Sequence, residues 1–514
     1  MDLFFLIVRR LNVIGNFKEL GTDRQRKETL IGLAATQLLV QLASMPIALV
    51  IPSVARHFDV NVAEAAWMVV IRLLMLGSTV FLAARLGQKY GHARIYFIGA
   101  IVLSGGSVMA ATSFSTMQLI LWSGLVGIGG AMVTANSNAI LSMVFPAEER
   151  GRAFAVPVVA ARFGTLIGLG MFGLFLQFFS LQWGWRMVFL SSLPIGLLAI
   201  YCSLPLLKYH VQQNVAEMKQ VSINYVGAIL MVATLGTFIL SGLHIHEGAE
   251  SFTTPDALGY HIPMHLLFFA CLALFFVIQQ RSSDPFVQFG YFKQKYFSMA
   301  LFTNTCFHLS MLAVTTLIPI LVENGLGQPP IFVALVLLPN QVLGLFLPTL
   351  GGWIHDRHDP RWLRPASLLL IASGFFLAGF FADDIPVLAL PLLLLPIAIG
   401  SNMFNSPNNA TVMNSLPDNR SFASGMLETT RQMGHSIGTT VSATVLGLAL
   451  PVAIDLLPRA EAQTHYLSGF QISALAVVWI MMSGGIVAIF QRTPTARSEQ
   501  PRAAPAPQPG GGDN

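Results

Sequence analysis

Residues 117–144 read MQLILWSGLVGIGGAMVTANSNAILSMV, a stretch without a single Asp, Glu, Lys or Arg. A helix needs about 20 apolar residues to cross a hydrocarbon core about 30 Å thick, and only helices and closed barrels satisfy the backbone there. Comparable stretches recur along the chain, so an all-α integral membrane protein with fourteen spans is predicted. The predicted spans are residues 29–52, 63–84, 95–114, 117–144, 153–179, 187–207, 223–243, 262–280, 296–322, 330–353, 365–382, 386–414, 422–450 and 468–490.

The composition excludes a soluble enzyme. Of the 514 residues, 54% are hydrophobic and 10% are charged, with a mean hydropathy of +0.66, whereas a soluble domain carries about 25% charged residues. Cys202, Cys271 and Cys306 all lie inside predicted spans, so neither a disulfide framework nor a thiolate metal site is expected. We expect no cofactor, no metal and no enzymatic activity, and the lipid bilayer as the surroundings of the chain.

Lysine and arginine residues are concentrated in the two tails and in alternate loops. These residues are Arg9 to Lys27, Arg85, Lys89, Arg94, Arg150, Arg152, Lys208, Lys219, Arg281, Lys293, Lys295, Arg357, Arg361, Arg364, Arg420 and the C-terminal tail. The intervening loops hold only Arg56, Arg186 and Arg459. Because cationic loops stay in the cytoplasm, both termini are predicted to be cytoplasmic. The pI of 9.2 therefore reflects topology, and no nucleic-acid partner is expected.

A short polar loop recurs after the second span of each half, which indicates a duplication. Residues 86–94 read LGQKYGHAR and residues 354–361 read IHDRHDPR. Their polar groups are predicted to clamp neighbouring helix ends by charge and dipole; these gate residues are Gln88, Lys89, Arg94, Asp356 and Arg357. The predicted parts are a tail (1–28), a six-helix bundle (29–207), a linker with two extra helices (208–295), a second six-helix bundle (296–490) and a disordered tail (491–514). Paired repeats with a site between them are usual in secondary transporters.

Several motifs, in order, resemble those of the major facilitator superfamily and, within it, of the fourteen-helix drug:proton antiporter branch. They are FPAEERGRA at 145–153, WRMVF at 185–189 with Pro194-Ile195-Gly196, GWIHDR at 352–357 and SGMLETTRQMG at 424–434. The resemblance implies the major facilitator fold, two six-helix bundles plus two additional central helices, with the bundles rocking about a central cavity.

The coupling positions of that family are altered in this chain. By the same resemblance, the acid of the first span falls at Ala43 and the arginine of the fourth span at Ser123. The acid of the first cytoplasmic loop falls at Gln88, and the Gly-Pro of the fifth span appears as Gly168-Leu169. The scaffold is kept, but the usual proton machinery is not.

Charged residues inside the spans are the leading site candidates, because each costs at least about 2.5–3.5 kcal/mol at a helix centre unless it is solvated or paired. Arg72 is predicted either to face the cavity and hold an anionic group of the cargo, or to snorkel to the outer interface. Glu428 and Arg431 share one helix face, and Glu428 is the leading proton carrier if coupling survives; the alternative is an ion pair at the cytoplasmic helix end. Arg162 is expected to form a pair at the cytoplasmic end rather than to bind a ligand.

Uncharged polar residues inside spans of both halves predict a wet central passage, since buried amides should face protein or water. For any single amide the alternative is a hydrogen bond between helices. The candidate cavity residues, besides Arg72, are Gln37, Gln41, Asn136, Asn304, His308, Asn340, Gln341 and Asn405.

The sequence as a whole favours a multi-pass exporter of small amphipathic molecules or drugs in the bacterial inner membrane, working by alternating access. A small-molecule substrate is the expected partner, with protons if transport is coupled, and a periplasmic adaptor is a further candidate partner. The alternatives are a facilitator or importer of a specific organic anion, and a membrane sensor or assembly partner without transport activity.

Overall fold

The computed structural model describes residues 23–43, 50–60, 62–210, 224–241, 255–282, 285–329, 331–451 and 457–491. Every regular element in these residues is a helix. The predicted terminal tails, apart from residues 23–28 and 491, lie outside the described residues.

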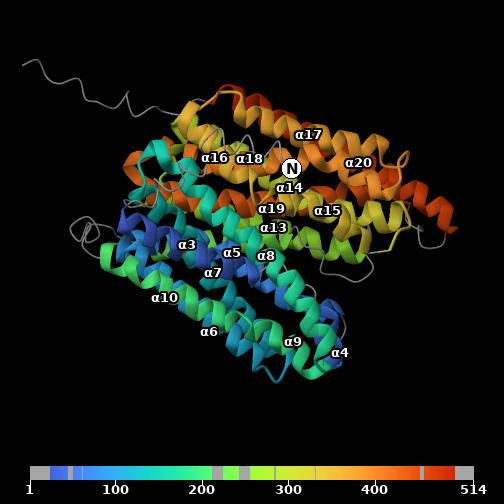
Figure 1. Cartoon of the computed structure of the whole chain (residues 1–514), viewed down its shortest axis with the longest axis horizontal. Helices are drawn as coiled ribbons and strands as arrows, with labels where there is room; N and C mark the ends of the chain where they lie inside the picture. Colours follow the sequence, from blue (N-terminus) through green and yellow to red (C-terminus); the bar gives the residue numbers. More distant parts are fainter. Residues whose placement is uncertain are drawn as a thin grey trace, which may run out of the picture.

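The N-terminal half forms one bundle, drawn from blue to green-cyan in Figure 1. Within it α6 packs on α7, α7 on α5, and α3 on both α8 and α10. Its helices are α3 (Arg24–Leu42), α4 (Ile51–Phe58), α5 (Val62–Tyr90), α6 (His92–Ala111), α7 (Thr116–Val144), α8 (Arg150–Phe178), α9 (Leu181–Leu190) and α10 (Ser192–His210).

The C-terminal half forms a second bundle, drawn from yellow to red in Figure 1. Here α14 packs on α19, and α17 packs on α18 and α20. Its helices are α14 (Lys295–Ile320), α15 (Ile331–Leu343), α16 (Leu347–His358), α17 (Leu363–Phe381), α18 (Leu390–Ser415), α19 (Arg420–Ala449) and α20 (Arg459–Ile489).

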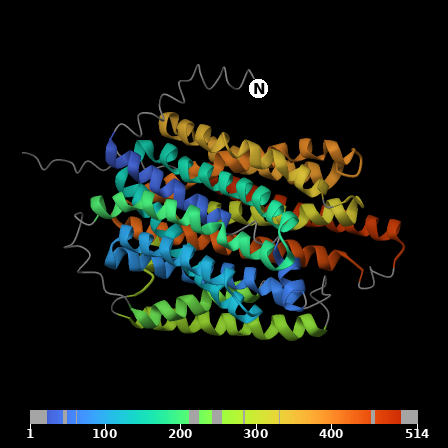
Figure 2. The same ribbon diagram turned by 60° about the horizontal axis from the view of Figure 1, so that its bottom comes forward.

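Two further helices between the halves, α12 (Tyr225–Ser241) and α13 (Pro255–Arg281), pack on each other. α12 also packs on α5, and Figure 2 shows the pair along one edge of the molecule. α13 leaves large apolar side chains uncovered, such as Leu266 and Phe269. An exposed apolar helix face of this kind suits contact with lipid.

Eleven of the described helices are long and apolar enough to cross a membrane. The other three predicted spans coincide with α3, α12 and α19, which do not meet that standard. α3 begins with Arg24, Arg26, Lys27 and Glu28, α12 has 17 residues, and α19 is rich in polar residues. The all-helical membrane fold is therefore confirmed, while the number fourteen remains a prediction.

Three predicted spans are interrupted rather than continuous. Span 29–52 contains the end of α3 at Leu42, and span 187–207 is divided between α9 and α10. Span 330–353 is divided between α15 and α16 at residues 344–346. A proline ring clashes with the carbonyl four residues earlier, and Pro194 and Pro348 lie four residues after Leu190 and Gly344, where the latter two breaks occur.

Candidate transport pathway and gate

Many of the arginines predicted to be cytoplasmic gather at one end of the molecule, which we call the basic end. It is defined by Arg85, Arg150, Arg152, Arg364 and Arg420, all near helix ends. In Figure 1 the ribbons of the two bundles meet at the left, where α8 begins and α16 ends, and diverge toward the right. The side-chain contacts described next join the two bundles at the basic end.

Arg150, at the first position of α8, ties the bundles together at the basic end. Its guanidinium donates to the carbonyls of Phe145 (3.1 Å) and Ser142 (2.8 Å) in its own bundle, and to the Oδ1 of Asn414 on α18. Arg420, at the start of α19, donates from the other side to the carbonyl of Ser142 at 2.9 Å. The carbonyl of Ser142 is thus shared by one arginine from each bundle.

Asp356, on the last turn of α16, binds the start of α8 across the seam. Its Oδ1 accepts the backbone N–H of Gly151 at 2.7 Å, and its Oδ2 accepts the N–H of Arg152 at 2.8 Å. The Nε of Arg152 approaches the same Oδ2 at 3.1 Å. A carboxylate at a helix N-terminus is stabilised by the free N–H groups and the helix dipole. Charge and helix dipole thus act together at this contact between the two bundles.

The first copy of the loop works differently, because Gln88 replaces an acid. Gln88 accepts from Arg85 of its own helix at 2.8 Å. The contact across the seam comes instead from His92, whose Nε2 lies 2.6 Å from the hydroxyl of Ser421 on the first turn of α19. Neither His92 nor Ser421 was predicted, since no charge or motif marks either residue as part of a contact between the bundles.

Asn136 holds this histidine in place. Its Nδ2 donates to the carbonyls of Ala83 (3.2 Å) and Met132 (2.7 Å), so its Oδ1 faces the ring and lies 2.7 Å from the Nδ1 of His92. That geometry places the ring proton on Nδ1 and leaves Nε2 to accept from Ser421. Asn136 was expected to line the passage; it is fully buried and supports the gate instead.

Three predicted gate residues lie outside these contacts. Lys89 lies over the rings of Tyr90 and Tyr225 at 5.6 and 5.7 Å, Arg94 is exposed, and Arg357 lies over Trp353 at 5.9 Å. Their charges belong to the surface of the basic end, as is usual for a solvated cluster of cations.

An aromatic layer closes the seam just inside the polar contacts. Phe81 of α5 meets Phe422 of α19 edge to face, with ring centroids 5.8 Å apart. Phe286, from the segment before α14, meets Phe81 at 5.3 Å. Edge-to-face pairs of this kind add about 0.5–1.5 kcal/mol beyond the burial of their area. The layer was not predicted, since phenylalanines in apolar spans carry no distinguishing pattern.

Glu428 lies about 12 Å along α19 from its start, and its side chain is 1% exposed. Its Oε2 is 3.1 Å from the Nη1 of Arg431, too poorly aligned for a hydrogen bond. Its Oε1 accepts from Gln432 at 3.2 Å. Among the described helices, it is the carboxylate farthest from a helix end. The Glu428–Arg431 pair therefore lies well inside the helix rather than at its surface end.

Asn304 and His308 lie inside the second bundle rather than on a passage. Asn304 donates to the carbonyl of Leu427 (3.0 Å) and to Thr430 (2.9 Å), and so joins α14 to α19. The Nδ1 of His308 lies 3.2 Å from the Nε2 of His435. Both candidate residues are buried, so their role as cavity residues is not supported in this conformation.

Arg72 is 2% exposed, and its Nε, Nη1 and Nη2 have no hydrogen-bond partner among the described residues. Its guanidinium lies 5.9 Å from the ring centre of Phe189 in α9. The side chain neither snorkels to an interface nor faces an open passage here. Instead, the guanidinium is buried inside the first bundle, where the ring of Phe189 is the one interaction partner found in the described residues.

Arg162 lies about 18 Å along α8, at mid-depth, which corrects the expectation of a pair at the cytoplasmic end. Its Nη1 donates to the Oε1 of Gln341 and its Nη2 to the Oδ1 of Asn402, both at 3.2 Å. Both partners belong to the second bundle. Gln341 is a predicted cavity residue, whereas Asn402 is not among the predicted site residues.

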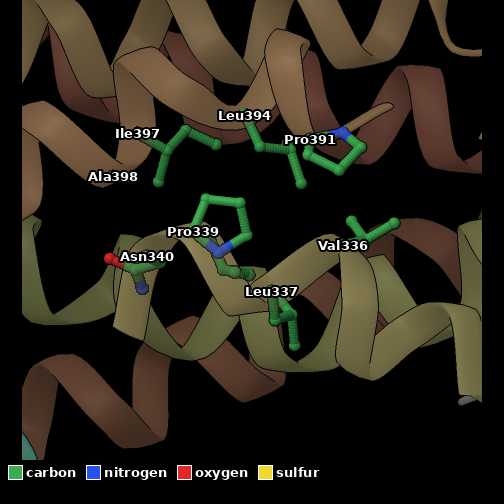
Figure 3. Close-up of a pocket in the computed structure, with 9 residues that line it drawn as sticks. Val336, Leu337, Pro339, Asn340, Pro391, Leu394, Ile397 and Ala398 are labelled. Carbon is green, nitrogen blue, oxygen red and sulfur yellow. The ribbon is translucent and has the colours of Figure 1, made fainter. Parts of the chain in front are cut away.

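The remaining candidates lie near this level. Gln37 and Gln41 are half-buried on α3, where Gln41 packs beside Gly164 of α8. Asn405 is half-buried, with an Oδ1 that has no partner in the described part of the chain. Asn340 accepts from Asn402 at 2.9 Å and borders a small pocket between α15 and α18 that is otherwise apolar, shown in Figure 3.

Cations outnumber carboxylates in the middle of the described helices. Arg72, Arg162 and Arg431 lie there with Glu428, which already faces Arg431. No group of three His, Cys, Asp or Glu side chains that could hold a metal ion occurs in the described ranges.

Two helical bundles joined at one end, with polar and charged groups at mid-depth between them, define the class of two-lobed membrane carriers. The model of the Major Facilitator Superfamily matches residues 33–439, and the chain belongs to that family of transporters.

Curated relatives share about a quarter of their residues with the chain. It is 24% identical to the riboflavin transporter RibZ of Clostridioides difficile, over 76% of this chain and 81% of RibZ. It is 25% identical to the multidrug resistance protein Stp of Mycobacterium tuberculosis, over 84% and 78%. It is 24% identical to the multidrug efflux pump LfrA of Mycolicibacterium smegmatis, over 80% and 79%.

Solved structures support the same fold. The proton:xylose symporter XylE superposes with a TM-score of 0.58 and 14% identity, covering 90% of this chain and 94% of XylE. The human organic anion transporter MFSD10 superposes with a TM-score of 0.53 and 16% identity, covering 91% and 100%. At these identities the likeness establishes the fold alone.

Proposed function

We propose that this major facilitator transporter exports small amphipathic molecules by alternating access, and that the structure represents its outward-facing state. The observation that carries the proposal is the position of the contacts between bundles. Polar contacts from Arg150, His92 and Asp356, with an aromatic layer behind them, join the bundles at the basic end. If that end is cytoplasmic, as the distribution of cations predicts, the pathway is closed to the cytoplasm.

The relatives support small organic cargo and, in two cases, export. Stp is named a multidrug resistance protein and LfrA a multidrug efflux pump, whereas RibZ is named a riboflavin transporter. Aromatic organic molecules are therefore suitable first cargoes, and ethidium and riboflavin represent the drug-like and the vitamin-like class. A periplasmic adaptor remains a candidate partner for export across a second membrane.

We assign proton coupling to Glu428. It is a buried carboxylate next to the seam, and Gln432, which donates a hydrogen bond to it, packs against Gly77 of α5 in the other bundle. Movement of α5 relative to α19 would therefore change the surroundings of this carboxylate. A carboxylate whose surroundings change between two states binds a proton differently in each, and that difference is what coupling requires.

The test uses purified protein in liposomes with ethidium or riboflavin and an imposed pH gradient. Glu428→Gln is expected to abolish uptake driven by the gradient while leaving exchange of cargo at equal pH, because the substitution keeps the shape but removes the titrating group. Glu148→Gln is the matched control, since Glu148 is exposed near the start of α8. Gradient-driven uptake that survives in the Glu428 variant would reject this role.

Two alternatives are separated by the same preparation. A facilitator or importer of a specific organic anion would show anion flux without any effect of the pH gradient. A sensor or assembly partner would bind a ligand but show no flux under any gradient.

A further inference from the structure

Arg162 occupies a built site at the seam, at mid-depth. Gly344, after the end of α15, provides the space: a Cβ there would lie 2.8 Å from the Nε of Arg162 and 3.0 Å from its Cδ. The amide of Asn402 is fixed in turn, since its Nδ2 donates to Asn340 (2.9 Å) and to the carbonyl of Ala398 (2.8 Å). Its Oδ1 must therefore face the arginine.

The site holds a cation without a counter-charge. Both hydrogen-bond partners of Arg162 in the described residues are neutral amides, at the long distance of 3.2 Å. Glu428, the carboxylate farthest from a helix end in the described helices, faces Arg431 at 3.1 Å. A guanidinium away from water binds a carboxylate in a bidentate manner, with bonds roughly twice as strong as those to neutral acceptors.

The partners of Arg162 also depend on the conformation. Arg162 belongs to the first bundle, whereas Gln341 and Asn402 belong to the second. Rotation of one bundle against the other changes these distances, and a hydrogen bond weakens quickly beyond about 3.5 Å. The side-chain amides of Gln341 and Asn402 can therefore accept hydrogen bonds from Arg162 only in conformations that resemble this one.

From these observations we infer that Arg162 binds the carboxylate of an anionic cargo, and that Gln341 and Asn402 displace this carboxylate when the basic end closes. This inference rests on the proposed export function and adds its substrate class. In the inward-facing state the guanidinium is available to the anion. In the outward-facing state the amides compete for it, so affinity falls on the side where cargo is released.

The arrangement makes the affinity for cargo higher in the inward-facing state than in the outward-facing state, which favours release outside, while the energy for net export comes from the proposed proton coupling. A ligand shifts a two-state equilibrium only by its difference in affinity between the states. Cargo bound to Arg162 favours the state in which the amides are withdrawn, and loss of cargo allows the amides to return. Gln341 and Asn402 are positioning residues in this scheme, and Arg162 is the binding residue.

The experiment compares acids with their own amides as probes. Dansylglycine and 1-naphthoate are titrated against the full-length protein in detergent, each beside the corresponding neutral amide. Wild type should bind the acids more tightly than the amides. Arg162→Gln should weaken acid binding by about tenfold, which corresponds to about one charge-assisted hydrogen bond, and leave amide binding unchanged. Gln341→Ala should strengthen acid binding, because a competitor is removed.

Two further variants keep the result interpretable. Arg162→Lys keeps the charge and should retain much of the preference for acids, which tests the charge if the glutamine variant does not fold. Arg281→Gln is the matched control, because Arg281 is exposed at the end of α13. Equal binding of acid and amide by wild type, no binding of either, or a preference that survives in Arg162→Gln would overturn the inference.

Counterflow in liposomes separates this inference from the proposed function. If the protein transports ethidium or riboflavin, and transports each acid and its amide equally well, the proposed export stands and the assignment of an anionic cargo is rejected. No flux of any of these compounds rejects transport itself.

Discussion

At the scale of single residues, Arg72 is a buried cation whose placement is costly in free energy. Arg72 has three guanidinium nitrogens without a described hydrogen-bond partner, beside Phe189. Moving a cation away from water costs several kcal/mol unless it is paired. A residue retained at such a cost is a strong candidate for a functional role, and a cargo anion or a change of state would supply the missing partner.

Arg72→Met is expected to raise thermal stability and to lower transport of anionic cargo more than of neutral cargo. Replacement of a buried charge by an apolar side chain of similar volume often stabilises a protein by roughly 1–4 kcal/mol. Thermal unfolding in detergent measures the first effect, and flux of an acid beside its amide measures the second. A variant that is less stable, with equal losses for both cargoes, would show that Arg72 has a purely structural role.

At the scale of the helices, two close approaches define the gate. α8 and α16 touch where a Cβ on Gly352 would lie 2.3 Å from the carbonyl of Gly151. α5 and α19 approach where a Cβ on Gly425 would lie 2.9 Å from the Cβ of Ala84. The first contact brings Asp356 to the N-terminus of α8, and the second brings Phe81 to Phe422. Each of these two contacts thus depends on a glycine one turn away in the same helix, Gly352 for Asp356 and Gly425 for Phe422.

Gly352→Ala is expected to hold the basic end open. The added methyl group meets backbone rather than a flexible side chain, and overpacking of this kind costs about 1–3 kcal/mol. That cost falls on the closed state alone, so the balance should shift toward the state open at the basic end. Spin labels on Arg94 and Arg357, both exposed at that end, would report longer distances.

Gly105→Ala is a suitable control for this measurement, because a Cβ at Gly105 would meet nothing within 4 Å. A distance distribution in Gly352→Ala that equals that of wild type and of the control would refute the role of this contact in closure.

At the scale of the whole molecule, sidedness links the fold to the direction of transport. The basic end is predicted to face the cytoplasm because the cations gather there. Reporter fusions are expected to place the stretch 150–152 in the cytoplasm and the stretch 247–256 on the opposite side. Fusions that report the same compartment for both would break the topology, and with it the outward-facing assignment.

Much of this architecture followed from the sequence alone. Apolar length dictates a helical membrane protein, because the bilayer leaves the backbone no other way to satisfy its hydrogen bonds. The recurring loops indicated two halves, and the second copy singled out Asp356, which the structure places against the start of α8; its role as a gate residue stays a prediction. Glu428 and Arg431 stood out because charged residues inside spans are rare.

The tertiary structure decided which polar residues meet. Spacing along one helix places Glu428 near Arg431, but no spacing relates Arg162 to Asn402 or His92 to Ser421, which lie far apart in the chain. For the same reason Asn136 was assigned to the passage when it supports the gate, and Arg162 to a helix end when it crosses the seam. Local sequence indicates on which face of its helix a side chain lies; only the packing of the two bundles determines its partner, and for Arg162 also its place at the seam.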